Sequence, residues 1–230
     1  MNPKSKIQHQ KFIERSLAPL RGRTIGFIGA GTMGQALLRG LRAKGVSSRR
    51  LLASDPSPAA RRAAARCGAR LCSLDALIRD ADVVVLAVKP QQMAHAVEAI
   101  APHVRPRQLV ISIAAGMTLR WLAQRLRRVP VVRAMPNLPA TVGCGFTAIT
   151  LGRAASAGHR RMAAALFGAA GAVCELPERL FDAVTAVSGS GPAYVFFLVQ
   201  AWEDAARALG LPPAAAAQAI RQTLSGSACL

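Results

Sequence analysis

The chain has 230 residues, of which 52% are apolar and 18% are charged. This composition is typical of a folded protein with a sizeable core, and it excludes a disordered or collagen-like chain. Thirty Lys and Arg residues against 11 Asp and Glu residues give a net charge of +19, which raises nucleic acid or another anionic ligand as a partner. The basic residues are scattered in ones and twos, however, and aromatic residues make up only 4%, so no specific nucleic-acid partner is expected.

Cysteine content and apolar run lengths bear on the compartment. The five cysteines are odd in number and form no C-x-x-C pair, so neither a disulfide framework nor a metal site is indicated, and a reducing cytoplasm fits. Charged or polar residues, among them Lys89 and residues 188–190, interrupt each apolar run before the length that a membrane span needs. We therefore expect no membrane-spanning helix and a cytoplasmic protein.

Residues 1–21 form a basic N-terminal extension with Glu14 as its single acid. They lack the apolar stretch of a secretory signal, and their Ser and Arg content supports an organelle-targeting role only weakly. We expect this segment to be a disordered, solvated extension.

The first ordered element is a short apolar strand at residues 24–28. It runs directly into Gly29-Ala30-Gly31-Thr32-Met33-Gly34, and a helix pattern follows over residues 35–44. In a G-x-G-x-x-G turn the first glycine makes the tight turn, the second lets the backbone approach a pyrophosphate, and the third lets the helix pack on the strand. The helix N-terminus then offers N–H groups to the phosphates. This arrangement predicts a dinucleotide site.

Asp55 follows a second strand at residues 50–54, at the distance where such folds place the acid that binds the adenosine ribose. An acid there favours NAD, whereas a nearby arginine favours the extra phosphate of NADP. Because Arg61 and Arg62 lie within the next turns, the sequence leaves the cofactor preference open.

Further strands are predicted at residues 82–88, 109–113, 129–134, 143–150 and 172–174, with helices at 59–66 and 154–167. The alternation predicts an α/β fold with a Rossmann doubly wound sheet over residues 22–176. Since ligands bind outside the carboxyl ends of such strands, Lys89 and Ala115 are expected at the cofactor site. Two prolines fix an extended loop around Asn137, whose amide is a further candidate.

After residue 174 only helix patterns remain, so residues 177–230 are expected to form an all-helical domain. Ser190 or Gly191 is placed as a helix cap, with Pro192 in the first turn. Residues 193–198 are apolar all round, which predicts burial in a helical bundle or a subunit interface.

Several separate stretches resemble the pyrroline-5-carboxylate reductase family, which completes proline biosynthesis. They are I-G-F-I-G-A-G-T-M-G (25–34), A-V-K-P (87–90), I-A-A-G (113–116), R-A-M-P-N (133–137), S-G-S-G-P-A-Y (188–194), G-L-P near residue 211 and Q-T-L-S-G-S-A (222–228). The resemblance implies a Rossmann domain, a helical domain that dimerises, and hydride transfer from NADPH, or NADH, to the C=N bond of 1-pyrroline-5-carboxylate.

The same resemblance implies the site. The expected cofactor contacts are Ile28, Gly29, Ala30, Gly31, Thr32, Met33, Gly34, Ser54, Asp55, Ala87, Val88, Lys89, Pro90, Ala115 and Asn137. The expected catalytic and substrate residues are Glu178, Ser188, Ser190 and Tyr194, although an aromatic side chain in an apolar helix is more often core packing. Family members usually have Asn where this chain has Thr32, a change that backbone phosphate contacts tolerate. They also continue for roughly forty residues with an S-P-G-G-T-T loop, so we expect the helical domain here to be incomplete.

Two other functions remain open at this point. One is a truncated, catalytically inactive dinucleotide-binding protein. The other is a related imine or β-hydroxyacid dehydrogenase, but its catalytic lysine belongs in the helical domain and no Lys follows Lys89.

Overall fold

The computed structural model describes residues 16–230. These residues fall into two compact units, which divide between Gly189 and Ser190. Most of the predicted N-terminal extension lies outside the described residues. Its last part is described: Ala18–Leu20 form a 3-10 turn, and Leu20 is buried in the core.

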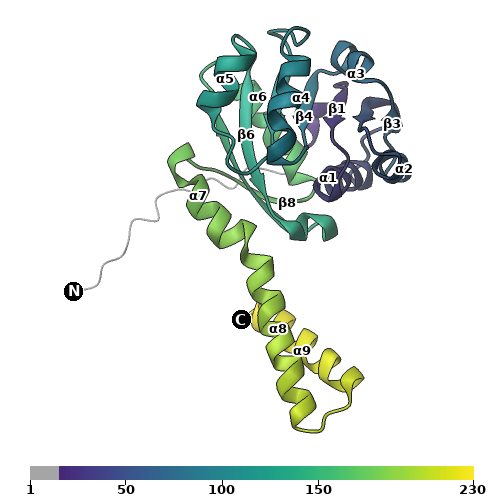
Figure 1. Ribbon diagram of the computed structural model, residues 1–230, viewed down its shortest axis with the longest axis vertical. Coiled ribbons are helices and arrows are strands. Elements are labelled where there is room, and N and C mark those ends of the chain that lie inside the picture. The colour runs from purple at the N-terminus through teal and green to yellow at the C-terminus, as the bar shows by residue number, and fades with distance from the viewer. Residues whose placement is uncertain (1–15) are drawn as a thin grey trace, which may run out of the picture. The chain divides into compact units, whose positions relative to one another are not determined.

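The first unit alternates strands and helices, and the second holds two helices (Figure 1). The strands are β1 (Ile25–Ile28), β2 (Leu51–Ser54), β3 (Arg70–Leu71), β4 (Val83–Leu86), β5 (Leu109–Ser112), β6 (Val131–Pro136), β7 (Gly145–Leu151) and β8 (Gly171–Glu175). The helices are α1 (Thr32–Ala43), α2 (Pro58–Arg66), α3 (Leu74–Asp80), α4 (Met93–Ile100), α5 (Leu119–Leu126), α6 (Ala157–Gly168), α7 (Phe181–Val184), α8 (Gly191–Ala208) and α9 (Pro213–Ser227).

All strands join one eight-stranded sheet in the order β3-β2-β1-β4-β5-β6-β7-β8. Strands β1 to β6 are parallel, β7 runs antiparallel to β6, and β8 pairs in parallel with β7. The predicted Rossmann fold is confirmed. Because β1 to β6 point the same way, the turns after β1, β4, β5 and β6 meet at one edge of the sheet.

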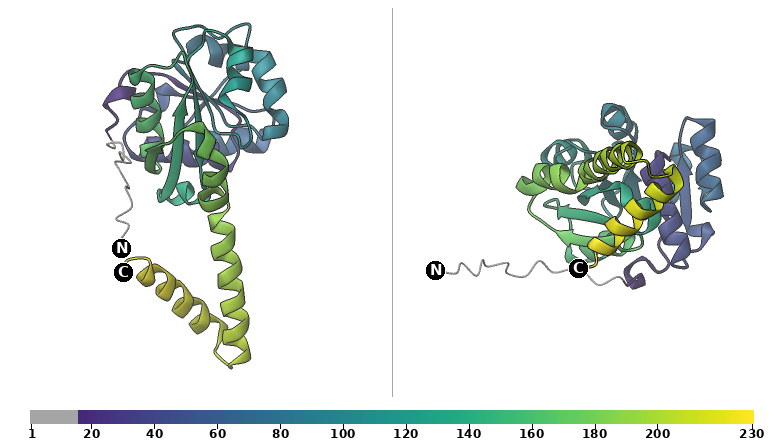
Figure 2. Two further views of the ribbon diagram at one scale, coloured as in Figure 1. Left: turned by 90° about the vertical axis from the view of Figure 1, so that its left-hand side faces the viewer. Right: turned by 90° about the horizontal axis from the view of Figure 1, so that it is seen from below.

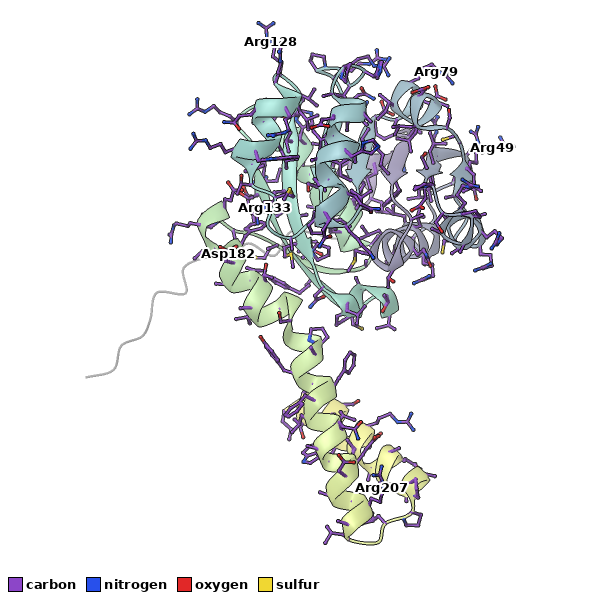
Figure 3. All side chains as sticks on the ribbon, viewed as in Figure 1. Arg49, Arg79, Arg128, Arg133, Asp182 and Arg207 are labelled. Carbon is purple, nitrogen blue, oxygen red and sulfur yellow. The ribbon has the colours of Figure 1, made fainter. Side chains whose placement is uncertain are left out.

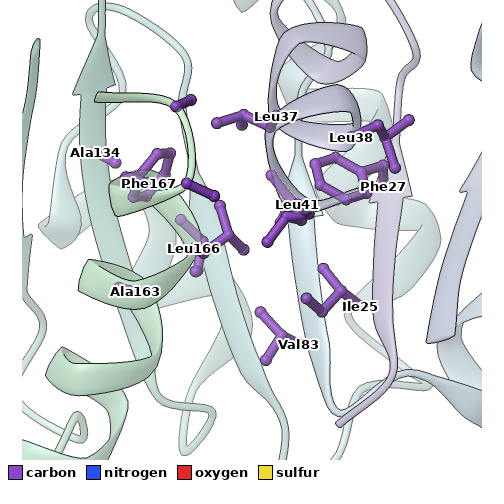
Figure 4. Close-up of a cluster of buried hydrophobic side chains, with 14 of the residues drawn as sticks. Ile25, Phe27, Leu37, Leu38, Leu41, Val83, Ala134, Ala163, Leu166 and Phe167 are labelled. Carbon is purple, nitrogen blue, oxygen red and sulfur yellow. The ribbon is translucent and has the colours of Figure 1, made fainter. Parts of the chain in front are cut away.

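Helices cover both faces of this sheet (Figure 2). On one face, Leu37 and Leu41 of α1 and Phe167 of α6 belong to the same buried apolar cluster as Ile25 and Phe27 of β1 (Figure 4). On the other face, α3, α4 and α5 pack on the alternate side chains of the same strands. Side chains on both faces of the sheet are thus buried, which explains why the central strands read as continuous apolar runs.

Serine and threonine side chains cap four helices of the first unit. Ser57, Ser73, Thr118 and Ser156 each accept a hydrogen bond from a backbone N–H in the first turn, at α2, α3, α5 and α6. At α1 the capping position is Gly31, and no side chain accepts from its first turn. The α1 N-terminus is therefore left for another acceptor.

The first unit runs on through Gly189, beyond the domain boundary expected at residue 176. Phe181 of α7 is fully buried, which explains why this segment belongs with the sheet. After α7 the chain makes a π-helical turn, Thr185–Gly189. Ser190 then holds the expected N-cap position of α8, but with helical backbone angles and no side-chain capping bond.

The second unit consists of α8 packed against α9, with Ala216 and Ile220 buried between them. Most large apolar side chains of α8 are exposed in the single chain, among them Tyr194, Phe196 at 61% and Phe197 at 78%. Two helices cannot enclose a helix that is apolar all round, so the single chain does not bury residues 193–198 in a helical bundle, and the other alternative, burial in a subunit interface, stays a prediction.

Candidate functional site

The glycine turn after β1 has the geometry that its sequence predicts. Gly29 has φ +91°, and a Cβ there would lie 2.7 Å from the carbonyl oxygen of Ala87. A Cβ on Gly34 would lie 3.0 Å from the carbonyl oxygen of Gly29. Gly29 and Gly34 are thus required by the protein's own packing.

Gly31 is different, because a Cβ on it would meet no protein atom within 4 Å. Its backbone angles, φ −69° and ψ −172°, are open to any residue. The glycine therefore leaves space next to the uncapped N-terminus of α1. A pyrophosphate fits such a place, since it needs both close backbone approach and free N–H donors.

Asp55 holds this turn with its carboxylate. Oδ2 accepts from the backbone N–H of Ala30 at 2.8 Å, and Oδ1 accepts from that of Ser57 at 2.8 Å. Arg61 lies beside it and donates to the backbone carbonyl oxygens of Asp55 and Pro56 at 3.2 and 3.3 Å. Both carboxylate oxygens are thus engaged with the protein, while an exposed guanidinium stands nearby.

The turns after β4 and β5 lie at the same edge. Ala87 donates its N–H to Ile28 of β1 at 2.8 Å, and Ile113 donates to Leu86 of β4 at 3.2 Å, so the loops leave the sheet side by side. Lys89 is exposed and Ala115 is partly exposed. The structure therefore brings these two predicted residues to the edge that holds the glycine turn.

Asn137 follows β6 at this edge and joins two other elements. Its Oδ1 accepts from the backbone N–H of Phe146 at 2.8 Å, and its Nδ2 donates to Oγ of Ser188 at 3.0 Å. Ser188 lies in the π-helical turn. The predicted residues Asn137 and Ser188 are thus in contact.

Glu178 lies in a 3-10 turn before α7 and pairs with Arg133 of β6, which is labelled in Figure 3. Its Oε1 accepts from Nη1 of Arg133 at 3.0 Å and from the backbone N–H of Leu119 at 2.7 Å. Sequence reasoning missed Arg133 as a partner, although an arginine inside an apolar strand was a signal that could have found it. Ser190 and Tyr194 belong to the second unit.

Among residues 16–230, no group of three or more His, Cys, Asp or Glu side chains could hold a metal ion.

Comparison with known proteins decides the family. The family model described as NADP oxidoreductase, coenzyme F420-dependent, matches residues 24–116, and the model for pyrroline-5-carboxylate reductase dimerisation matches residues 178–230. The pyrroline-5-carboxylate reductase of Pseudomonas aeruginosa is 44% identical over 211 residues, which cover 89% of this chain and 76% of that protein. The chain belongs to the pyrroline-5-carboxylate reductase family. The reductase of Pisum sativum is 36% identical over 90% of this chain and 77% of its own length.

Solved structures of the family agree. The pyrroline-5-carboxylate reductase of Coxiella burnetii matches with a TM-score of 0.82 at 32% identity, covering 90% of this chain and 78% of that one. The Plasmodium falciparum pyrroline carboxylate reductase, solved with NADP bound, matches with a TM-score of 0.83 at 28% identity over the same shares of the two chains.

One finding concerns the helical segment Glu178–Ala208. It is long and apolar enough to cross a membrane by length and composition alone. The expectation that residues 188–190 interrupt the apolar run is wrong, because the π-helical turn carries the helix through them. The pyrroline-5-carboxylate reductase dimerisation model matches residues 178–230, which include this segment.

Proposed function

We propose that this chain is a pyrroline-5-carboxylate reductase, which reduces the C=N bond of 1-pyrroline-5-carboxylate to give L-proline with NADPH. The observation that carries the proposal is the open glycine turn at Gly31 beside the uncapped N-terminus of α1, in a chain of this family. Bound NADPH supplies the hydride. The residues at the carboxyl edge of the sheet bind and orient the reactants.

The reaction requires little acid–base catalysis by the protein. A protonated imine is already electrophilic at carbon, so a hydride added there completes the reduction, and the nitrogen keeps its proton. Catalysis then depends mainly on holding the imine carbon against the nicotinamide. We assign this positioning to residues 188–192, with Glu178 and Tyr194 as further candidates from the family pattern.

The preference for NADPH over NADH rests on Asp55 and Arg61. An aspartate that binds both ribose hydroxyls favours NADH. Here each carboxylate oxygen already accepts one backbone N–H group, so only its remaining acceptor site is left for a ribose hydroxyl. The exposed Arg61 offers a positive charge for a 2′-phosphate at the same place.

The exposed apolar side chains of α8 support a homodimer or a larger homo-oligomer. An apolar face of this extent is costly in water, and a second copy of the chain buries it. We further propose a cytoplasmic enzyme without a specific nucleic-acid partner. All five cysteines are free, and Arg49, Arg79 and Arg128 stand at separate places on the first unit (Figure 3).

The deciding experiment follows NADPH oxidation by the purified 230-residue chain with and without 1-pyrroline-5-carboxylate, together with NADPH binding in the same sample. We expect binding and substrate-dependent oxidation. NADPH binding without oxidation at any substrate concentration would instead identify a dinucleotide-binding protein that lacks reductase activity. Reduction of NADP⁺ by β-hydroxy acids, or oxidation of NADPH by other imines but not by pyrroline-5-carboxylate, would support a related dehydrogenase.

A further inference from the structure

The two ends of the Asn137 side chain are not interchangeable. The backbone N–H of Phe146 can only donate, so the atom that faces it at 2.8 Å must be the amide oxygen. The NH₂ group therefore faces Ser188, at 3.0 Å from Oγ. The orientation of this amide is thus fixed by its hydrogen bonds.

This orientation decides what the Ser188 hydroxyl can do. Because Nδ2 of Asn137 donates, Oγ of Ser188 accepts, and the hydroxyl keeps its one hydrogen for another acceptor. Thr185 in the same π-helical turn uses its hydroxyl differently, since it donates back to the carbonyl oxygen of Phe181 at 2.8 Å. Within residues 16–230 the hydrogen bonds include no acceptor for the Ser188 hydroxyl.

The hydroxyl also lies at the right edge of the sheet. Asn137 directly follows β6, and parallel strands β1, β4 and β5 end in the glycine turn and the loops with Lys89 and Ala115. The π-helical turn is held against this edge by the Asn137 contact and by the buried Phe181. π-helical turns are frequent at functional sites.

We propose that Asn137 is a positioning residue, which makes the Ser188 hydroxyl a hydrogen-bond donor to an oxygen of the bound reactants. The acceptor is a carboxylate or carbonyl oxygen, supplied either by the substrate carboxylate or by the carboxamide of the nicotinamide. This inference rests on the proposed function. It gives Asn137 a role besides the expected contact with the cofactor, since one Nδ2 hydrogen and one Oδ1 lone pair are already bound within the protein.

The variant Asn137→Asp tests the inference with almost no change in size. One carboxylate oxygen still accepts from Phe146, but the second oxygen replaces the donor, so the Ser188 hydrogen turns toward it. We expect Asn137→Asp and Ser188→Ala to raise the same KM, for pyrroline-5-carboxylate or for NADPH, by about tenfold, as for one lost hydrogen bond. The reactant whose KM rises identifies the acceptor.

The double variant should lose no more than the larger single loss, because both changes remove one donor. Ser188→Thr, which keeps the hydroxyl, should recover most of the affinity. Ser73→Ala serves as the control, since it removes a hydroxyl that also accepts from a backbone N–H, at the cap of α3, and should leave both KM values unchanged.

Three results would overturn the inference: unchanged KM values for Asn137→Asp, unchanged KM values for Ser188→Ala, or strictly additive losses. A loss of thermal stability in Asn137→Asp with normal KM values would show a purely structural role. The dissociation constants of NADPH, and of proline in the presence of NADP⁺, are measured on the same variants. If the wild type binds NADPH but does not reduce pyrroline-5-carboxylate, the proposed function fails. The role of Asn137 is then decided by comparing these dissociation constants between the variants and the wild type.

Discussion

Arg133 and Glu178 form an ion pair that ties β6 to the segment before α7, with Nη1 and Oε1 at 3.0 Å. The arginine side chain is 5% exposed and the glutamate 32%. The guanidinium also lies over the Phe181 ring, at 4.7 Å from its centroid. A nearly buried charge thus has one carboxylate and one aromatic face as its neighbours, which makes the loss of either partner costly.

Replacing Glu178 should destabilise the first unit. Glu178→Ala leaves Arg133 nearly buried without its counter-ion, and we expect a loss of about 2 kcal/mol in the free energy of unfolding, less than for a fully buried pair. Urea unfolding of the first unit measures it. The double variant Arg133→Met with Glu178→Ala should recover part of the loss, since no charge then remains buried. Equal stability of Glu178→Ala and wild type would show that the pair contributes nothing.

Gly31→Val should abolish cofactor binding without harming the fold. A Cβ at this position would meet no protein atom within 4 Å, and the backbone angles are allowed for a residue with a side chain, so thermal unfolding should match the wild type. It does fill the space left for the pyrophosphate, and we expect NADPH affinity to fall by at least about tenfold, or 1.4 kcal/mol. Gly158→Ala in α6, where the added Cβ would lie 3.4 Å from Oγ of Ser156, is the matched control and should bind normally. Normal NADPH binding by Gly31→Val would place the cofactor elsewhere.

Asp55→Asn tests whether the carboxylate serves the glycine turn or the ribose. An amide can accept from only one of the two N–H groups of Ala30 and Ser57, so the turn loosens. We therefore expect NADPH and NADH affinities to fall by the same factor, about fivefold for one lost bond. Fluorescence titrations with both cofactors give the two factors. A loss confined to NADH would mean that Asp55 binds the ribose hydroxyls instead.

The sequence predicts the sheet well because the central strands are buried on both faces and read as unbroken apolar runs. The two-residue strand β3 has no such run, and it was not predicted. The glycine turn was predictable because G-x-G-x-x-G is a short local pattern. Gly29 and Gly34 are required by the packing of the turn, and Gly31 leaves space beside the N-terminus of α1.

Pairings across the fold were not predictable in this way. Arg133 meets Glu178 only because β6 and the segment before α7 pack together, and Asn137 meets Ser188 for the same reason. Single residues of this kind carry no periodic signal. The π-helical turn likewise depends on packing, since Ser-Gly-Ser-Gly by itself favours a loop.

The exposed α8 side chains predict a concentration-dependent assembly. Phe197→Asp should shift the chain toward monomer, because a charge placed in an apolar interface is not compensated. Light scattering coupled to size-exclusion chromatography measures the mass of the particle. Gln218→Glu on the exposed part of α9 adds the same charge and should leave assembly unchanged. A monomeric wild type would remove the support for an interface at α8.

His159 should make stability fall in mild acid. Its Nδ1 accepts from the backbone N–H of Ser156 at 3.0 Å in a capping box that begins α6, a contact only the neutral imidazole can make. Burial, and secondarily the charge of Arg23, lower the pKa of His159 below its usual value of 6.5. Protonation is thus harder in the folded state, so the contribution of His159 is complete above pH 6.5 and declines as the pH falls below it. His159→Gln keeps an acceptor that does not titrate, and urea unfolding at pH 7 and pH 5 should show a smaller decline than in the wild type. All other titrating groups are the same in the wild type and in His159→Gln. An equal decline of the free energy of unfolding in the two proteins would therefore mean that protonation of His159 does not affect stability.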